Sequence, residues 1–200
     1  MKRNHRNFAA LFGTAVLATA GLAAVGSPAA VAAPASGAAR VGADASVTAG
    51  LKEALREQQA AHPNASGRHI CYAAHVQNIG WQNAVCDGAI AGTTGQSLRM
   101  EALDIAVSGV SGVCAEAHVQ NVGWQGWRCG GDGVDVYVGT TGQSLRMEAL
   151  GVRVGTGSVC ADAHVQNIGW QGWACSPSGG SVFVGTTGQS LRMEAISMTV

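Results

Sequence analysis

The stretch that decides the fold is GTTGQSLRMEA at residues 92–102, which recurs letter for letter at residues 139–149 and 185–195. A second stretch, HVQNIGWQ or HVQNVGWQ, precedes it in every copy and begins at His75, His118 and His164. Successive histidines are 43 and 46 residues apart, so the chain contains three copies of one unit. A repeat of this length indicates units that share one core, because a single unit cannot cover its own apolar face.

Each unit contains four segments that predict short strands. The first strand runs from a leading cysteine to the glutamine of HVQ, and the second runs from the tryptophan to a trailing cysteine. The third strand is predicted at residues 89–91, 134–138 and 181–184. The fourth begins near Ser97, Ser144 or Ser190 and continues to Val107, Val154 or Val200.

Four strands in three copies predict an all-β domain of about twelve short strands with three-fold pseudo-symmetry over residues 67–200. The repeats fall at about residues 69–108, 112–155 and 158–200. A β-prism-like and a β-trefoil-like architecture both fit this count, and the sequence leaves the choice open.

The six cysteines form three pairs, with a separation of 15 residues in every copy. Internal symmetry favours one bridge per repeat, and a secreted context permits oxidation. If the leading cysteine faces the trailing one, the hairpin sets His75 opposite Gln82 and Val76 opposite Trp81. A zinc site is disfavoured because the close C-x-x-C pairing is absent, and we expect no metal or other cofactor. The predicted disulfides are Cys71–Cys86, Cys114–Cys129 and Cys160–Cys175.

Residues 1–33 have the layout of a secretory signal peptide. Three basic residues within the first six precede an apolar run over residues 8–25, and A-x-A sites place the cleavage between about residues 32 and 35. A retained transmembrane anchor is the alternative, but no positively charged flank follows the run. We therefore expect a secreted, extracellular protein, free or associated with the cell surface.

Residues 34–66 are rich in Ala, Gly and Ser and predict a linker with one short helix over residues 48–61. Thr48 can cap this helix, and Leu51 and Leu55 lie one turn apart on one side. The sequence leaves open whether the helix docks on the domain or serves as a spacer.

Net charge limits the partners. The formal net charge is +0, only 12% of the residues are charged, and no long basic run follows residue 6. Removal of residues 1–33 takes away three of the twelve Lys and Arg and none of the twelve Asp and Glu, which leaves −3. Phosphate backbones and anionic membranes attract clustered positive charge. We therefore expect no nucleic-acid partner and no membrane partner after signal cleavage.

The two repeated phrases, HVQN[IV]GWQ and GTTGQSLRMEA, resemble those of the ChW family, the clostridial hydrophobic repeats with a characteristic tryptophan, in three tandem copies over about residues 70–200. The resemblance implies a secreted or surface protein with a role in attachment or macromolecular assembly. The paired cysteines are an adaptation of the hairpin and not the family's defining feature. The Ala- and Gly-rich leader also resembles the secretory sequences of actinomycetes.

The repeated tryptophans have two alternative roles. Trp81, Trp124 and Trp170 could fill the shared core, where one indole buries a large area. They could instead form an aromatic platform for a sugar ring, with neighbouring amides as hydrogen-bond groups. Trp127 and Trp173, which Ala84 replaces in the first copy, are expected on the opposite face of the hairpin. The candidate ligand-binding residues are Asn78, Trp81, Gln82, Asn121, Trp124, Gln125, Trp127, Asn167, Trp170, Gln171 and Trp173.

Each unit also contains a histidine, an arginine and a glutamate that a catalytic site could use, such as His75, Arg99 and Glu101. A catalytic site is usually one asymmetric group of side chains, whereas every candidate here occurs three times. Cross-strand hydrogen bonding of the histidine and glutamine, and charged pairs that bridge strands or repeats, explain these residues more simply. We expect no catalytic residue.

The sequence predicts a non-catalytic, multivalent module that attaches to a polysaccharide or another cell-wall or extracellular polymer. A protein-interaction or envelope-assembly module is the alternative, and a small secreted hydrolase is less favoured.

Overall fold

The computed structural model describes residues 43–62 and 67–200. The predicted signal peptide, residues 1–33, lies outside the described residues, as do residues 34–42 and 63–66 of the predicted linker. The described chain forms fifteen β-strands and one helix, α1 (Ala45–Ala61), and this confirms the all-β class.

The strands fall into three sets of five, one set for each repeat. The first set is β1 (His69–Val76), β2 (Gly80–Trp81), β3 (Val85–Cys86), β4 (Ala91–Gly92) and β5 (Met100–Ser108). The second set is β6 (Val113–Val119), β7 (Gly123–Trp124), β8 (Arg128–Gly130), β9 (Val136–Gly139) and β10 (Met147–Val154). The third set is β11 (Cys160–Val165), β12 (Gly169–Trp170), β13 (Ala174–Cys175), β14 (Ser181–Gly185) and β15 (Met193–Thr199).

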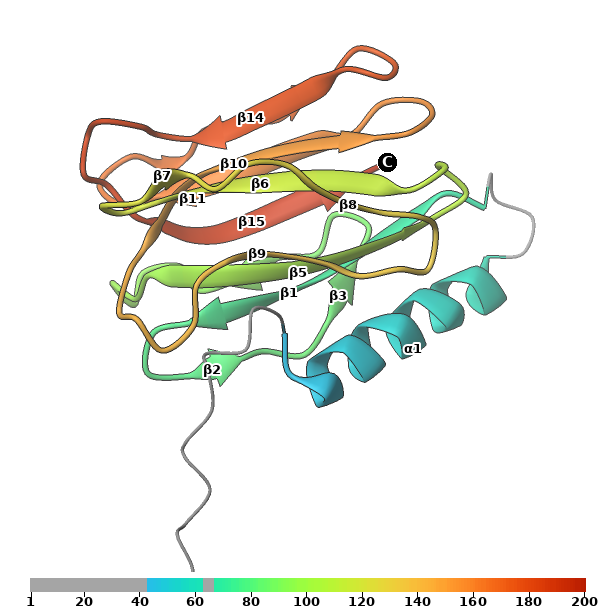
Figure 1. Cartoon of the computed structure of the whole chain (residues 1–200), viewed down its shortest axis with the longest axis horizontal. Helices are drawn as coiled ribbons and strands as arrows, with labels where there is room; N and C mark the ends of the chain where they lie inside the picture. Colours follow the sequence, from blue (N-terminus) through green and yellow to red (C-terminus); the bar gives the residue numbers. More distant parts are fainter. Residues whose placement is uncertain (1–42, 63–66) are drawn as a thin grey trace, which may run out of the picture. The chain divides into compact units, whose positions relative to one another are not determined.

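Each of the three antiparallel sheets is completed by a strand from another repeat (Figure 1). The first sheet has the order β2-β1-β5-β9, so the second repeat supplies its last strand. In the same way β14 of the third repeat pairs with β10 of the second. The exchange closes on itself, because β4 of the first repeat pairs with β15 of the third. No repeat therefore contains a complete sheet of its own.

The three sheets enclose one shared core. On β1 the residues Ile70, Tyr72, Ala74 and Val76 alternate with outward-facing residues and are fully buried, as the two-residue period of a strand requires. The same core cluster contains Met147 and Leu150 of β10 and Met193 and Ile196 of β15, among others. Three separate sheets around one core form the β-prism-like arrangement, and the trefoil-like alternative is not the one that the chain adopts.

The predicted second strand is broken into two short pieces, such as β2 and β3, and this raises the count from about twelve strands to fifteen. Cys71 faces Cys86 as expected, but His75 faces Trp81 and Val76 faces Gly80. The predicted pairing of His75 with Gln82 is therefore wrong by one residue. The stretch from Trp81 to Cys86 is one residue longer than the stretch from Cys71 to His75 that it faces, and this extra residue shifts the register.

The helix α1 docks on the outer side of β1, β3 and β5, and this settles the question that the sequence leaves open (Figure 1). Leu51 and Leu55 are buried there against Cys71 and Ala106. The helix begins at Ala45 rather than at residue 48, with Asp44 at its N-cap. The predicted cap at Thr48 is wrong: Thr48 lies within the first turn of the helix, and its hydroxyl donates a hydrogen bond of 3.2 Å to a carboxylate oxygen of Asp135.

Candidate functional site

The outward side of each sheet carries the residues that the sequence singles out. We call these sides face 1 (β2, β1, β5 and β9, with β3), face 2 (β7, β6, β10 and β14, with β8) and face 3 (β12, β11, β15 and β4, with β13). One disulfide lies on each face, and the three predicted bridges, Cys71–Cys86, Cys114–Cys129 and Cys160–Cys175, are confirmed. No described cysteine remains free.

A cluster of one glutamate, one arginine and one histidine recurs on every face with nearly the same geometry. On face 2, Arg146 donates to Oε1 of Glu148 from Nε at 3.0 Å and from Nη2 at 2.7 Å. The Nδ1 atom of His118 lies 3.1 Å from Oε2 of the same carboxylate. The glutamate is nearly buried. Faces 1 and 3 repeat this cluster with Arg99, Glu101 and His75 and with Arg192, Glu194 and His164.

This cluster corrects one explanation drawn from the sequence and refines another. The histidine contacts the glutamate of the neighbouring strand and does not pair with the glutamine. The arginine bonds to the glutamate two residues along the chain, and that glutamate contacts the histidine, so the charged pair bridges two strands of one repeat. Each glutamate carboxylate is thus hydrogen-bonded to its arginine and lies 3.1–3.2 Å from the histidine Nδ1 of the neighbouring strand.

The repeated tryptophans lie on the outer faces and not in the core. The indole of Trp124 stands edge-on to the ring of His118, with centroids 5.3 Å apart and an angle of 79° between the planes. Trp124 is 41% exposed and Trp170 is 38% exposed, whereas Trp81 is half-buried. No described tryptophan belongs to the buried core, which consists of aliphatic residues, Met, Ala and Tyr72. The core-filling role considered from the sequence is therefore not the one these indoles have.

The three predicted glutamines each form hydrogen bonds with the glycine that ends β4, β9 or β14. Oε1 of Gln82 accepts a hydrogen bond of 2.7 Å from the amide of Gly92, and its Nε2 donates one of 3.2 Å to the carbonyl oxygen of the same residue. The same pair of hydrogen bonds joins Gln125 to Gly139 and Gln171 to Gly185. These glycines need positive φ, and a Cβ on Gly92 would lie 2.3 Å from the carbonyl oxygen of Glu194. The glutamines therefore help to fasten the exchanged strand.

The three predicted asparagines, Asn78, Asn121 and Asn167, lie at the tips of the hairpin turns and are exposed. Each has φ between 62° and 63°, a left-handed conformation that asparagine tolerates better than most residues. An aliphatic residue follows each of them and is about half exposed: Ile79 at 50%, Val122 at 54% and Ile168 at 49%.

The second tryptophan set lies on faces 2 and 3. The expected placement on the opposite face of the hairpin is wrong on face 2, because Trp124 and Trp127 both contact the ring of Phe183 on the outer side of the sheet. Trp173 is 51% exposed and Trp127 is half-buried. On face 2, Phe183 of the exchanged strand β14 is 53% exposed and makes edge contacts with Trp124 at 5.5 Å and with Trp127 at 6.0 Å between centroids. We call Trp124, Trp127 and Phe183 the face 2 aromatic cluster. The sequence does not predict Phe183 at this site, because the residue comes from another repeat and only the strand exchange brings it there.

Face 1 differs because α1 covers part of it. The helix packs on Ala84, the residue that replaces Trp127 and Trp173, and on Ala106. By register, Ala106, Arg153 and Thr199 occupy equivalent positions, each opposite the leading cysteine of its sheet. The first copy thus has alanine, Ala84 and Ala106, at both positions on which the helix packs. A cavity of about 440 Å³ remains between the first turns of α1 and Trp81.

The docked helix lies over a buried acid on face 1. Asp104 is fully buried, and neither of its carboxyl oxygens has a hydrogen-bond partner among the described residues. Burial, together with the nearby carboxylate of Asp135, raises the pKa of Asp104 to about 7. Asp135 itself forms an ion pair of 3.0 Å with Lys52 of α1. The second and third copies have Gly151 and Ser197 at the position of Asp104.

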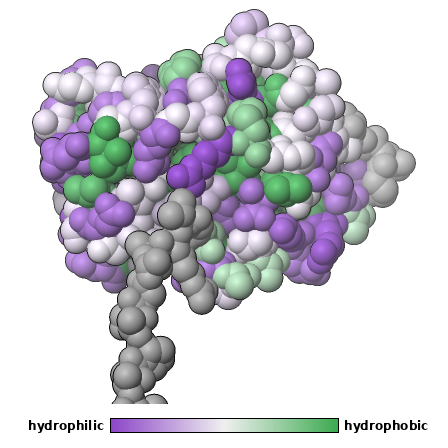
Figure 2. Space-filling model, viewed as in Figure 1, coloured by the Kyte–Doolittle hydropathy of each residue, from purple (hydrophilic) through white to green (hydrophobic). Residues whose placement is uncertain are grey.

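Two further properties bear on the kind of site. Within residues 43–62 and 67–200, no group of three or more His, Cys, Asp or Glu side chains is arranged to hold a metal ion. In the same part of the chain no helix has the length and apolar character to span a membrane. The apolar residues on the side of the molecule shown in Figure 2 lie in several patches separated by polar residues.

Comparison with known proteins gives one match. The chain matches no curated protein and no solved structure. The family model described as "Clostridial hydrophobic W" matches residues 75–109, 118–155 and 164–200, one match for each repeat and together more than half of the chain. The chain therefore belongs to the ChW (clostridial hydrophobic W) family.

Proposed function

We propose that this protein is an extracellular, non-catalytic module that attaches, through more than one site, to a polysaccharide or another cell-wall or extracellular polymer. The binding groups are the exposed tryptophans of faces 2 and 3 and the polar hairpin turns beside them. Three disulfides in so small a domain are typical of proteins in oxidising, extracellular compartments and support this location.

The observation that carries the proposal is the exposure of large aromatic side chains at equivalent places. Trp124, Trp170 and Trp173 are 41%, 38% and 51% exposed in a chain with only 5% aromatic residues. Exposed aromatic surface next to amide groups offers an apolar plane with hydrogen-bond partners at its edge, and this suits a sugar ring. The His, Arg and Glu groups support a non-catalytic role, because each glutamate is held by its arginine.

The two open faces give the multivalency that the proposal needs. α1 covers part of face 1, and Trp81 on that face is half-buried beside His75 and Tyr137, so we assign the binding to faces 2 and 3. Two weak sites on one polymer bind more tightly than either alone, because the first contact raises the effective concentration of the second.

The test is retention on insoluble polysaccharides, namely peptidoglycan sacculi, cellulose and chitin. The double variant Trp124→Ala/Trp170→Ala should lose retention, while its melting temperature stays close to that of the wild type because both indoles are partly exposed. A buried indole would instead cost about 3–5 kcal/mol. Trp81→Ala, which changes the covered face, is the matched control and should keep retention. Unchanged retention of the double variant would overturn the proposal.

The second candidate function is binding to a protein partner, and the exposed turn tips favour it. Val122 and Ile168 are 54% and 49% exposed, and exposed apolar surface rimmed by polar residues is typical of protein-interaction sites. If no polysaccharide retains the wild-type protein, the variant Val122→Ser/Ile168→Ser should be compared with wild type for binding to cell-envelope proteins.

A further inference from the structure

Face 2 presents an arginine that has no counterpart on the other two faces. Arg153 lies on β10 opposite Cys114 and is exposed. The equivalent residues are Ala106 on face 1 and Thr199 on face 3. The arginines that bind glutamates occur in all three copies, whereas Arg153 occurs in the second copy only. Arg153 is therefore a feature of face 2 alone.

The guanidinium of Arg153 is held in place by an aromatic ring and not by an acid. Its Cζ atom lies 4.8 Å from the ring centroid of Trp127, within the range of a cation–π contact. Among the described residues it forms no ion pair, in contrast to Arg99, Arg146 and Arg192, which each bind a glutamate. Its hydrogen-bond donors are therefore directed by Trp127 and remain available to a ligand.

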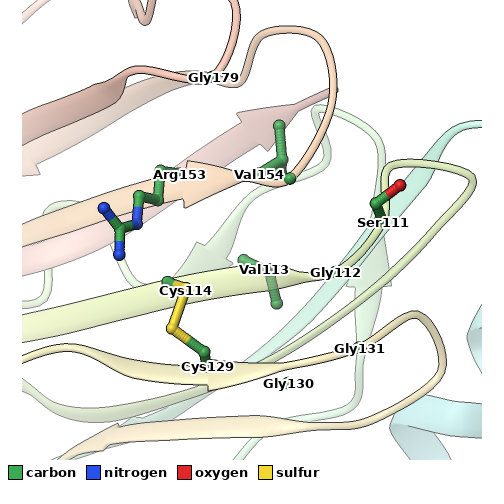
Figure 3. A pocket seen from close by; sticks show the side chains of 11 residues that line it. Ser111, Gly112, Val113, Cys114, Cys129, Gly130, Gly131, Arg153, Val154 and Gly179 are labelled. Carbon is green, nitrogen blue, oxygen red and sulfur yellow. A yellow bond between two sulfur atoms is a disulfide. The ribbon is translucent and has the colours of Figure 1, made fainter.

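A cavity adjoins this arginine. It has a volume of about 440 Å³ and is lined by Arg153, the disulfide of Cys114 and Cys129, and glycine-rich turns (Figure 3). Arg153 and the disulfide lie on neighbouring strands in the close-up. The volume falls within the usual range for small-ligand sites, about 300–1,000 Å³. Trp127, which Arg153 contacts, also contacts Phe183, and Phe183 contacts Trp124.

The geometry points to an anionic sugar as the ligand of face 2: a carboxylate-bearing residue of a polysaccharide whose ring lies on Phe183, with Trp124 at its edge, and whose carboxylate binds Arg153. A guanidinium presents a planar pair of donors that matches a carboxylate. This inference rests on the proposed function, because it names the class of polymer for one of its sites. Face 3, with Trp170 and Trp173 but Thr199 in place of the arginine, is the neutral counterpart.

The acid closest in register does not neutralise this site. Glu116 pairs with Gly151, two residues from Arg153 along β10, and is nearly buried. It forms no ion pair with Arg153. The carboxylate of Asp132 accepts hydrogen bonds of 3.2 and 2.8 Å from the amides of Ser111 and Gly112 and is occupied by them.

The experiment compares polygalacturonate with its fully methyl-esterified form, which has the same rings without the charge, at physiological ionic strength. A short oligogalacturonate measured by calorimetry avoids the contribution of two-site binding. We expect the wild type to prefer the acid, and Arg153→Thr to weaken its binding about tenfold or more while binding of the ester is unchanged. Thr199→Arg places an arginine beside Trp173 and should strengthen binding of the acid.

The alternative outcomes have separate meanings. Equal binding of acid and ester, unaffected by Arg153→Thr, would overturn this inference and leave the proposed function standing. Equal binding of polyglutamate, an anionic polymer without sugar rings, would also overturn it, because charge alone would then explain the result. If neither form of the pectic polymer nor any insoluble polysaccharide binds the wild type, both the inference and the proposed function fail. Melting temperatures of both variants near that of the wild type ensure that the comparison reports binding.

Discussion

The side-chain amide of Gln125 forms two hydrogen bonds with the main chain of Gly139, the last residue of the strand that completes the neighbouring sheet. Oε1 accepts from the glycine amide at 2.8 Å, and Nε2 donates to the glycine carbonyl at 3.1 Å. Gly139 also pairs with Ala102 of the first repeat. One glutamine thus joins the hairpin of its own repeat to the point where that repeat enters the sheet of another.

Replacing this glutamine should weaken the whole domain. We expect Gln125→Leu to lower the free energy of unfolding by about 1–3 kcal/mol, because the amide of Gly139 loses its partner in a partly buried place. Urea denaturation measures this change. Gln143→Leu is the matched control: Gln143 is exposed in a turn, and its replacement should change the free energy by less than about 0.5 kcal/mol. Equal effects of the two variants would contradict the role assigned to Gln125.

The buried carboxyl of Asp104 should make stability depend on pH. Its pKa is about 7 in the folded protein and near 4 in the unfolded chain, so the folded state binds more protons between these values. The free energy of unfolding should therefore fall as pH rises from about 4 to about 7 and level off above that range. Asp104→Asn removes the titrating group while keeping the shape of the side chain.

The measurement is urea denaturation of wild type and Asp104→Asn at several pH values between 4 and 8. The difference between the two proteins should grow with pH in the direction that favours the variant at pH 8. Other groups titrate in both proteins alike, so the difference isolates Asp104. A difference that stays constant across this range would show that the carboxyl keeps its ordinary pKa.

The sequence predicts those features that depend on one repeat and misses those that depend on two. The disulfides follow from equal spacing and hairpin geometry, and the β class follows from the repeat. The position of Phe183 beside Trp124 does not, because it depends on which sheet the third strand enters. The one-residue register error at His75 has a different cause, because it arises within one hairpin: the chain between Trp81 and Cys86 is one residue longer than the stretch of β1 that it faces.

The strand exchange predicts that a single repeat does not fold alone. A peptide of residues 67–110 retains β1 and β5 but lacks β9, which pairs with β5, and leaves β4 without β15. Its apolar residues, among them Tyr72 and Ile105, would lose the cover of the other two sheets. We expect narrow amide dispersion in the NMR spectrum of the oxidised peptide. A cooperative unfolding transition of a monomeric peptide would contradict the closed three-sheet architecture.

The alanine at position 84 should decide whether α1 can dock. Ala84 packs with Leu51 and Leu55, and the other two copies have Trp127 and Trp173 at this position. We expect Ala84→Trp to displace the helix, since the indole would occupy the space that the two leucines fill. Helices in proteins draw most of their stability from tertiary packing, so the displaced α1 segment should lose helical structure. Hydrogen exchange of the α1 amides should therefore accelerate, while Ala84→Ser, a small replacement, should leave it slow.

Displacement also exposes the carboxyl of Asp104 to water, so the dependence of stability on pH described above should disappear in the tryptophan variant. Slow exchange in both variants would show that face 1 holds the helix without the space that alanine leaves.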